Sequence, residues 1–236
     1  MKELIRKILL TVDNPAIAVS DGQLDQLNEF ALNLLRYGRE RGLTALQSPE
    51  DIARELIVDS LGAMPFIKSG SRIADLGSGA GIPGIPLAIV NPECSFIMIE
   101  SQNRKAKWIE EQIIHLNLQT RAHALPMRIE DAAHNPNWRG KLDFITAKAL
   151  TSLPSLIELA LPLLKVGGCL LAYKAVKIQE ELDISENALE KLHGRAEDCF
   201  LYNLDGRERN VCVIKKLKTT SKNYPRRVGV PQHNPL

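Results

Sequence analysis

Several features are scarce in this chain of 236 residues, and each absence narrows the function. Aromatic residues make up only 5%, so we do not expect a surface that binds nucleic acid by stacking many bases. The four cysteines, Cys94, Cys169, Cys199 and Cys212, stand far apart and form no C-x-x-C pair. This spacing favours free thiols in a reducing compartment, with no bound metal.

Long apolar runs are also missing. The first residues, MKELIRKILL, are interrupted by charge and lack the apolar core and cleavage site of a secretory signal. No run approaches the roughly 20 apolar residues that cross a bilayer. A hydrophobic content of 44% and a charged content of 25% are ordinary for a globular domain. We therefore expect a soluble, cytoplasmic protein that has no membrane partner.

Acidic residues are absent after Glu208, although the net charge of the whole chain is only +2. The basic residues of this segment are Arg209, Lys215, Lys216, Lys218, Lys222, Arg226 and Arg227. A block of one charge sign at the end of a chain often meets a polyanion such as RNA. A solvated tail that only aids solubility has the same composition, so charge alone leaves both interpretations open.

Residues 1–66 are predicted to be helical. Apolar residues recur at helical spacing after a cap at Ser20 or Asp21, and Ser48-Pro49 has the pattern that begins another helix. After Ser71, short strands at 72–76, 95–100, 120–125, 142–146 and 169–174 alternate with helices at 83–90, 103–115, 152–164 and 176–192. Two further strands are expected near 196–203 and 210–216.

This alternation predicts an α/β fold whose mainly parallel sheet is covered by helices on both faces. The last two strands are close enough in sequence to form an antiparallel hairpin at one edge. The chain then divides into an N-terminal helical extension (1–66), a sheet domain (67–217) and a basic C-terminal tail (218–236), which we expect near the RNA.

A glycine-rich loop follows the first strand and reads Asp75-Leu76-Gly77-Ser78-Gly79-Ala80-Gly81. Ligands bind open α/β sheets at this end of the strands, and the alternating glycines allow positive φ and a close backbone approach. The dinucleotide-binding pattern G-x-G-x-x-G does not match when it starts at Gly77, because its last glycine falls on Ile82. When it starts at Gly79 the pattern matches, but Pro83 then already lies in the predicted helix. Asp75 would repel a pyrophosphate and suits a cationic amino-acid headgroup.

Glu100 ends the second strand, roughly 20 residues further on, where an acid can accept hydrogen bonds from both ribose hydroxyls. This feature alone does not separate S-adenosylmethionine from NAD. After the third strand, Arg128-Ile129-Glu130 could place backbone N–H groups against an adenine edge. A surface ion pair between Arg128 and Glu130 is an equally good explanation of those charges.

The pattern Asp-x-Gly-x-Gly-x-Gly resembles the first motif of class I methyltransferases, whose loop wraps the methionine part of S-adenosylmethionine. Together with residues 77–89, the C-terminus YPRRVGVPQHNPL resembles the RsmG family, also called GidB. Leu43-Thr44-Ala45 and Asp59-Ser60-Leu61 fit that family too. The resemblance covers essentially the whole chain.

The resemblance implies a class I, Rossmann-like methyltransferase that methylates N7 of a guanine in 16S rRNA, as free RNA or in the small ribosomal subunit. It implies a cofactor pocket lined by Asp75, Gly77, Ser78, Gly79, Gly81, Glu100, Ile129 and Glu130. It places on the RNA side Lys148, Arg209, Arg226 and Arg227. Lys148 would also position the substrate, and no acid–base residue is assigned because guanine N7 carries no proton.

Four positions depart from the usual family pattern, and one of them is Gly42, where Asn is common before Leu-Thr-Ala. Glu55 stands where His is usual, Lys148 where Arg is frequent and Ala175 where Gly follows Lys. Lys148 keeps the charge of Arg but loses its planar, two-pronged donor. Two rival hypotheses follow from the sequence: an NAD-dependent oxidoreductase on a related sheet, and a non-catalytic RNA-binding or ribosome-assembly factor on the same fold.

Overall fold

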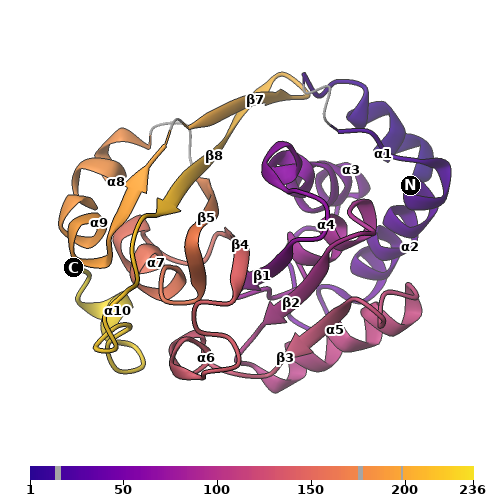
Figure 1. Ribbon diagram of the computed structural model, residues 1–236. Coiled ribbons are helices and arrows are strands. Elements are labelled where there is room, and N and C mark those ends of the chain that lie inside the picture. The colour runs from indigo at the N-terminus through magenta and orange to yellow at the C-terminus, as the bar shows by residue number, and fades with distance from the viewer. Residues whose placement is uncertain (14–16, 175–177, 198) are drawn as a thin grey trace.

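In the computed structural model, which describes residues 1–13, 17–174, 178–197 and 199–236, a single sheet organises the chain (Figure 1). Within these residues the strand order is β3-β2-β1-β4-β5-β8-β6, and β7 pairs with β8. The strands are β1 (Arg72–Leu76), β2 (Ser95–Ile99), β3 (Ala122–Leu125), β4 (Leu142–Lys148), β5 (Leu164–Lys174), β6 (Gly194–Ala196), β7 (Phe200–Leu204) and β8 (Arg207–Lys216).

Strands β1 to β5 pair in parallel, whereas β8 is antiparallel to β5, β6 and β7. The predicted α/β class, the parallel core and the antiparallel C-terminal strands are therefore confirmed. The order reverses direction at β1 and β4, and ligands bind α/β sheets beside such a switch point.

The helices after the first strand are α4 (Gly84–Val90), α5 (Asn103–His115), α6 (Ile129–His134), α7 (Leu153–Ala160), α8 (Gln179–Asp183), α9 (Glu186–Leu192) and α10 (Val230–His233). Successive strand residues point to opposite faces, so Ile73 and Phe96 join one apolar cluster, and Ala74 and Ile97 join the other. The first cluster includes α4, α5 and the N-terminal helices, and the second includes α6, α7 and α9.

The N-terminal region is helical, as predicted, with α1 (Lys2–Leu9), α2 (Asp21–Tyr37), α3 (Pro49–Asp51), the π-helix η1 (Ile52–Val58) and the 3-10 helix η2 (Asp59–Phe66). Ser20 caps α2: its side chain accepts from the backbone N–H of Gln23, and the Gln23 side chain accepts from the Ser20 N–H. Phe30 and Leu34 of α2 are buried in the first cluster. Helices η1 and η2 bury Ile52, Ile57 and Leu61 in the same cluster, and η2 contacts β8.

Several element boundaries differ from the sequence-based prediction. Residues 176 and 177 of the predicted helix lie outside the described residues, as does Ala175, and the remainder forms two short helices, α8 and α9. The predicted strand near 196–203 is divided between β6 and β7, and α7 ends at Ala160, earlier than expected. The short helices α6 and α10 were not predicted, because four to six residues carry too little periodicity to show a helix.

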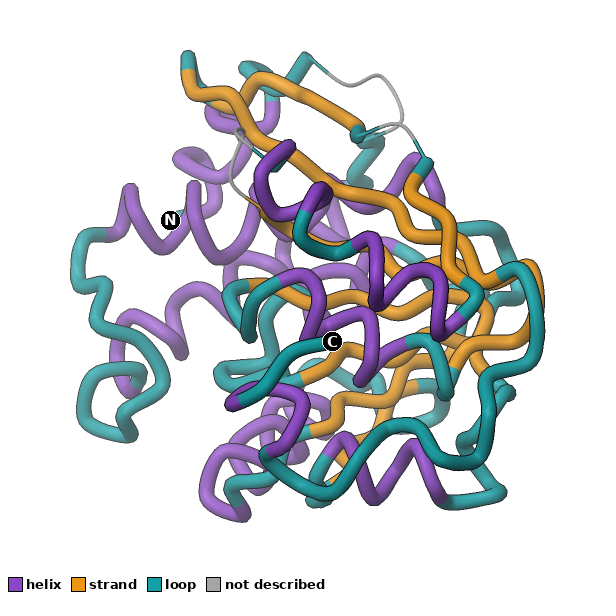
Figure 2. The backbone as a smooth tube through the Cα atoms, turned by 90° about the vertical axis from the view of Figure 1, so that its left-hand side faces the viewer, coloured by secondary structure: helices purple, strands orange, loops and turns teal. Residues whose placement is uncertain are grey.

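The C-terminal tail runs back along the molecule, and helix α10 contacts α7. The turned view shows the chain end lying over this side of the protein (Figure 2). Arg139 holds the tail by donating to the backbone oxygens of Thr220, Ser221 and Tyr224 at 3.1, 2.8 and 2.8 Å. Across the described ranges, no helix has both the length and the apolar character that a membrane span requires.

Candidate active site

The glycine loop leaves β1 with a backbone that only glycine adopts readily. Gly77, Gly79 and Gly81 have φ values of +64°, +56° and +90°, which cost a residue with a Cβ about 1–2 kcal/mol each. The backbone N–H groups of Gly77 and Ser78 both donate to the carbonyl oxygen of Ile99 at the end of β2, at 2.9 and 3.3 Å. A Cβ on Gly79 would meet only the Gly77 oxygen, at 3.8 Å, so this part of the loop borders open space.

Asp75 lies beneath this loop and is only 1% exposed. Its Oδ1 accepts from the Thr146 hydroxyl at 3.0 Å, and its Oδ2 accepts from the Gly84 N–H at 3.2 Å, so the carboxyl joins β1 to β4 and to α4. Burial raises the pKa of Asp75 to about 7, although its hydrogen bonds lower the pKa in part. The negative charge of the nearby Glu100 adds to the rise. Asp75 thus supports the loop from below; direct contact between its carboxylate and a ligand remains a prediction.

Glu100 is 6% exposed and holds the other side of the loop. Its Oε2 accepts from the Gly79 N–H at 2.9 Å and its Oε1 accepts from the Gln102 N–H at 2.8 Å. The same carboxylate lines a cavity, so it stands where an acid at the end of a second strand receives ribose hydroxyls.

That cavity has a volume of about 240 Å³ and lies between the glycine loop, the end of β2 and α6. It is lined by Gly77, Gly79, Ile99, Glu100, Ser101, Gln102, Lys105, Met127, Arg128, Ile129, Glu130, Leu150 and Gln232. A glycine cradle, an acid placed for ribose and the apolar side chains of Met127 and Ile129 fit the three parts of S-adenosylmethionine. The residues present therefore suit this cofactor.

Five of the predicted cofactor residues line this cavity: Gly77, Gly79, Glu100, Ile129 and Glu130. The other three support it from behind. Asp75 supports the loop as described above, and the Ser78 hydroxyl donates to the Asp75 carbonyl oxygen at 3.0 Å. Gly81 packs closely on α4, since a Cβ at this position would lie 2.5 Å from Ile85 Cδ1. Sequence reasoning missed Leu150 and Gln232, because each lies far along the chain from the glycine motif.

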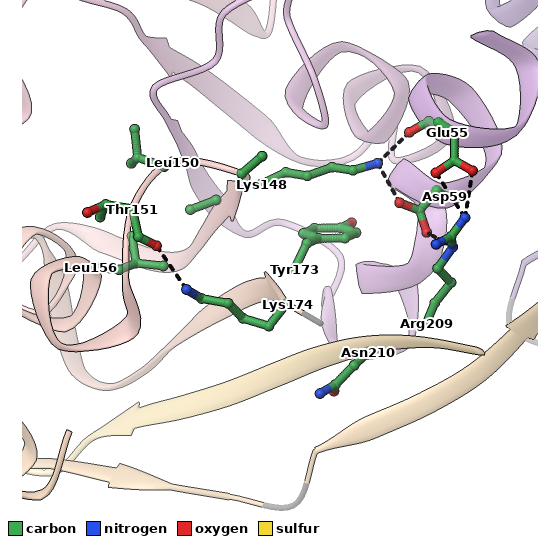
Figure 3. Close-up of a pocket in the computed structure, with 12 residues that line it drawn as sticks. Glu55, Asp59, Lys148, Leu150, Thr151, Leu156, Tyr173, Lys174, Arg209 and Asn210 are labelled. Atoms are coloured by element: carbon green, nitrogen blue, oxygen red, sulfur yellow. Dashed lines mark hydrogen bonds and ion pairs between the residues drawn. The ribbon is translucent and has the colours of Figure 1, made fainter. Parts of the chain in front are cut away.

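A second cavity, of about 380 Å³, adjoins the first, and Leu150 lines both (Figure 3). The charged side chains in it come from four parts of the chain: η1 and η2 contribute Glu55 and Asp59, β4 contributes Lys148, β5 contributes Lys174, and β8 contributes Arg209. The cavity is also lined by Ala147, Ala149, Leu150, Thr151, Leu156, Tyr173 and Asn210.

The charges of this second cavity are paired. Lys148 donates to the Glu55 carbonyl oxygen and forms an ion pair with Asp59 Oδ2 at 2.5 Å. Arg209 donates from one terminal nitrogen to both carboxylate oxygens of Glu55, at 2.7 and 2.9 Å. The charge of Glu55 is therefore balanced by Arg209.

Tyr173 forms the floor of the charged cluster and is 8% exposed. Its hydroxyl donates to the Ser60 carbonyl oxygen and accepts from the Ala63 N–H at 3.2 Å. Burial holds the pKa of Tyr173 well above its usual value, and the neighbouring carboxylate of Asp59 adds to the effect. The Lys148 ammonium lies 5.6 Å from the centre of the Tyr173 ring, so the tyrosine orients this lysine and stays uncharged.

The four predicted RNA-side residues do not form one patch. Lys148 and Arg209 meet in the second cavity, whereas Arg226 and Arg227 line an open hollow between the tail and α6. Arg226 is engaged by Glu158, a fully buried acid of α7, through an ion pair of 2.6 Å. Arg227 is exposed. The RNA-binding roles of all four residues remain predictions.

The fold and the glycine-loop cavity define a class I methyltransferase that uses S-adenosylmethionine. A crystal structure of an S-adenosylmethionine-dependent methyltransferase from Aquifex aeolicus has a similar fold, with a TM-score of 0.52 at 18% identity; the similarity covers 71% of this chain and 94% of that one. At this identity the likeness concerns the fold alone.

The sequence comparisons are more specific. The family model GidB, described as rRNA small subunit methyltransferase G, matches residues 23–212. The ribosomal RNA small subunit methyltransferase G of Acetivibrio thermocellus is 38% identical over 242 residues, covering 100% of this chain and 98% of that protein. The protein of the same name from Oenococcus oeni is 34% identical over 234 residues, covering 98% and 96%.

The chain therefore belongs to the GidB family of small-subunit rRNA methyltransferases. This membership confirms the family, the cofactor and the enzyme class that the sequence predicts, and it decides against an NAD-dependent oxidoreductase. No group of three His, Cys, Asp or Glu side chains that could hold a metal occurs in the described parts of the chain.

Proposed function

We propose that this protein transfers the methyl group of S-adenosylmethionine to N7 of a guanine in 16S rRNA, and that the guanine enters the second cavity. One observation carries this proposal: the two cavities share a wall at Leu150. A donor held by the glycine loop and a base held beside Lys148 would therefore be neighbours. Proximity of this kind can contribute roughly 7–11 kcal/mol to the lowering of a barrier.

The chemistry suits a site without a general base. Guanine N7 has an in-plane lone pair and no proton, so it attacks without being deprotonated. When bound, S-adenosylmethionine supplies an electrophilic methyl on a sulfonium. The residues of the second cavity then have to orient the base: Lys148 can donate to the guanine carbonyl oxygen, and Tyr173 holds the lysine in place.

The acidic side chains of the cavity would stabilise the product of the reaction. Methylation at N7 leaves the guanine with a positive charge. The carboxylates of Glu55 and Asp59 stand in the same cavity, where water is partly excluded and charge interactions are stronger than in bulk water. They favour the cationic product, while Arg209 and Lys148 keep the empty cavity close to neutral.

The size of the cavity also bears on the substrate. A base reaches it only after leaving its stack, which costs a few kcal/mol and is easiest in single-stranded RNA. Ribosomal RNA loops present such bases, so we place the target in a loop of 16S rRNA, either free or within the small subunit. This substrate supports the cytoplasmic location expected from the sequence.

The test uses ribosomal RNA from cells that lack this gene. Purified protein and S-adenosylmethionine with a labelled methyl group are incubated with free 16S rRNA in one arm and with small subunits in the other. Mass mapping of the digested RNA should show 7-methylguanosine at one position in at least one arm. Retained RNA binding without any incorporation would favour the alternative, a non-catalytic assembly factor.

A further inference from the structure

The C-terminal tail contributes a side chain to the cofactor cavity. Gln232, in helix α10, lines the cavity together with Glu100 at the end of β2 and with Ile129 and Glu130 of α6. It lies far along the chain from the glycine loop. We propose that Gln232 is a cofactor-binding residue that contacts the adenosine half of S-adenosylmethionine.

The tail is fixed on both sides of Gln232. Upstream, Arg226 forms a two-oxygen contact with the buried Glu158: its Nε lies 2.9 Å from Oε1 and its terminal nitrogen 2.6 Å from Oε2. Downstream, the same guanidinium donates to the Asn234 carbonyl oxygen at 2.7 Å. One arginine thus closes a loop of tail around Gln232, and the position of Gln232 is set before any ligand binds.

A separate contact joins the tail to the cavity wall. The Gly229 N–H donates to Glu130 Oε1 at 2.9 Å, and Glu130 is 4% exposed. Gly229 has a φ of +82°, so a side chain at this position would strain the turn that delivers the helix. The glycine therefore lets the tail reach α6 at the point where α6 borders the cavity.

The lining of the cavity indicates which half of the cofactor Gln232 would meet. Glu100, placed for the ribose, accepts from the Gly79 N–H of the glycine loop, and it lines the cavity together with Ile129 and Glu130 of α6. The base attached to the ribose is then expected at the α6 end, where the tail arrives. Gln232 is exposed, and its amide carries both a donor and acceptors, which suits an adenine edge.

The inference rests on the proposed use of this cavity for S-adenosylmethionine, and the experiment separates the two. Full-length Gln232→Ala is compared with the parent and with His233→Ala, a change at the next residue of α10, which does not line the cavity. Calorimetric titrations use S-adenosylmethionine and, as a fragment, adenosine. Thermal unfolding checks that all three proteins are folded.

Loss of one hydrogen bond predicts affinities roughly 3- to 10-fold weaker for Gln232→Ala with both ligands, and parental values for His233→Ala. If the parent does not bind S-adenosylmethionine, the proposed function and the inference both fail. If the parent binds and Gln232→Ala binds S-adenosylmethionine equally well, only the inference is overturned. A loss with S-adenosylmethionine but not with adenosine would overturn the assignment to the adenosine half.

Discussion

Leu150 lies directly against the position that a side chain on Gly77 would occupy: a Cβ there would be 2.4 Å from Leu150 Cδ1. Leu150 follows β4 and lines both cavities, so this contact joins the glycine loop to the proposed base site. Gly77 is therefore required for two independent reasons, its φ of +64° and its closeness to Leu150.

The first prediction separates these two reasons. Gly77→Ala should destabilise the protein more than Gly70→Ala, because Gly70 also has a positive φ, of +76°, but a Cβ there meets no atom within 4 Å. Urea unfolding should show a loss of about 1–2 kcal/mol for Gly70→Ala from backbone strain alone. Gly77→Ala should lose more and bind S-adenosylmethionine at least several-fold more weakly by calorimetry.

Adding Leu150→Ala to Gly77→Ala removes the steric conflict and leaves only the strain. The double variant should therefore regain part of the lost cofactor affinity. Equal effects of the two glycine substitutions, with no gain from the second change, would contradict the role given to Leu150.

A second prediction concerns Lys148. Its side chain is 17% exposed and forms an ion pair with the nearly buried Asp59. Lys148→Ala should reduce methyl transfer to RNA by about 10-fold or more, the effect of losing one charge-assisted hydrogen bond, because it removes the donor proposed to orient the base. Binding of S-adenosylmethionine should be unchanged, since Lys148 does not line the cofactor cavity.

Two matched variants make this test specific. Lys148→Arg keeps the positive charge and a hydrogen-bond donor at this position, so it should keep most of the activity of the parent. Lys165→Ala is the control, because the Lys165 side chain is 46% exposed and forms an ion pair with Asp143. This lysine lines neither cavity. Activity lost equally in the Lys165 and Lys148 variants would mean that the loss does not come from the site.

The third prediction distinguishes the two neighbouring arginines of the tail. Arg226→Ala leaves the fully buried Glu158 without its cation, and breaking a buried pair in this way costs about 3–5 kcal/mol. Arg227→Ala changes an exposed residue and should alter stability by less than about 0.5 kcal/mol. Urea unfolding measures both.

RNA affinity measured across salt concentrations separates the two positions further. If Arg227 contacts a phosphate, Arg227→Ala should lower affinity and reduce the salt slope by roughly 0.7–0.9, with cofactor affinity unchanged. An unchanged slope would remove Arg227 from the RNA surface. A stable Arg226→Ala variant would show that the Glu158 contact does not hold the tail.

The sequence was informative wherever local chemistry determines the structure. The cap at Ser20 depends on residues three positions apart, and the glycine loop depends on φ values that few other residues adopt. Glu100 could be assigned because the chain position after the second strand defines its place at the sheet edge. These features need no knowledge of distant contacts.

Other features depend on contacts between distant parts of the chain. The basic composition of the tail gives no sign that Arg226 pairs with Glu158, 68 positions away; its place on the RNA side stays a prediction. One local sign was available: Glu158 is a lone acid in the apolar helix LPSLIELA, and a buried acid needs a partner. Nothing near Gln232 or Leu150 indicates the cofactor cavity, because both reach it only through the tertiary fold.

The last prediction is a pH dependence centred on Asp75. Its usual pKa is 3.8 and burial raises the folded value to about 7. As the pH rises between these values, the unfolded chain has released the Asp75 proton and the folded chain has not, so the contribution of Asp75 to stability falls. Below the unfolded pKa the contribution is fully present, and above about pH 7 the loss is complete.

Asp75→Asn should abolish this contribution to the pH dependence of the free energy of unfolding. The amide oxygen can accept from the Gly84 N–H, and the amide nitrogen can donate to the Thr146 hydroxyl oxygen, so both contacts of Asp75 can be kept. In urea unfolding at a series of pH values, the variant should gain stability relative to the parent from pH 4 to pH 7 and keep a constant advantage above that.

Asp143→Asn provides a control of opposite sign. Bonds from Lys165 and the Arg72 N–H lower the pKa of Asp143 despite partial burial, so this acid stabilises the fold above its unfolded pKa and loses that effect as the pH falls through the folded value. The Asp143→Asn variant should therefore be less stable than the parent, and the difference in the free energy of unfolding should be largest near neutral pH. Parallel curves for parent and Asp75→Asn would mean that the pKa of Asp75 is the same in the folded and the unfolded chain, and that burial does not raise it.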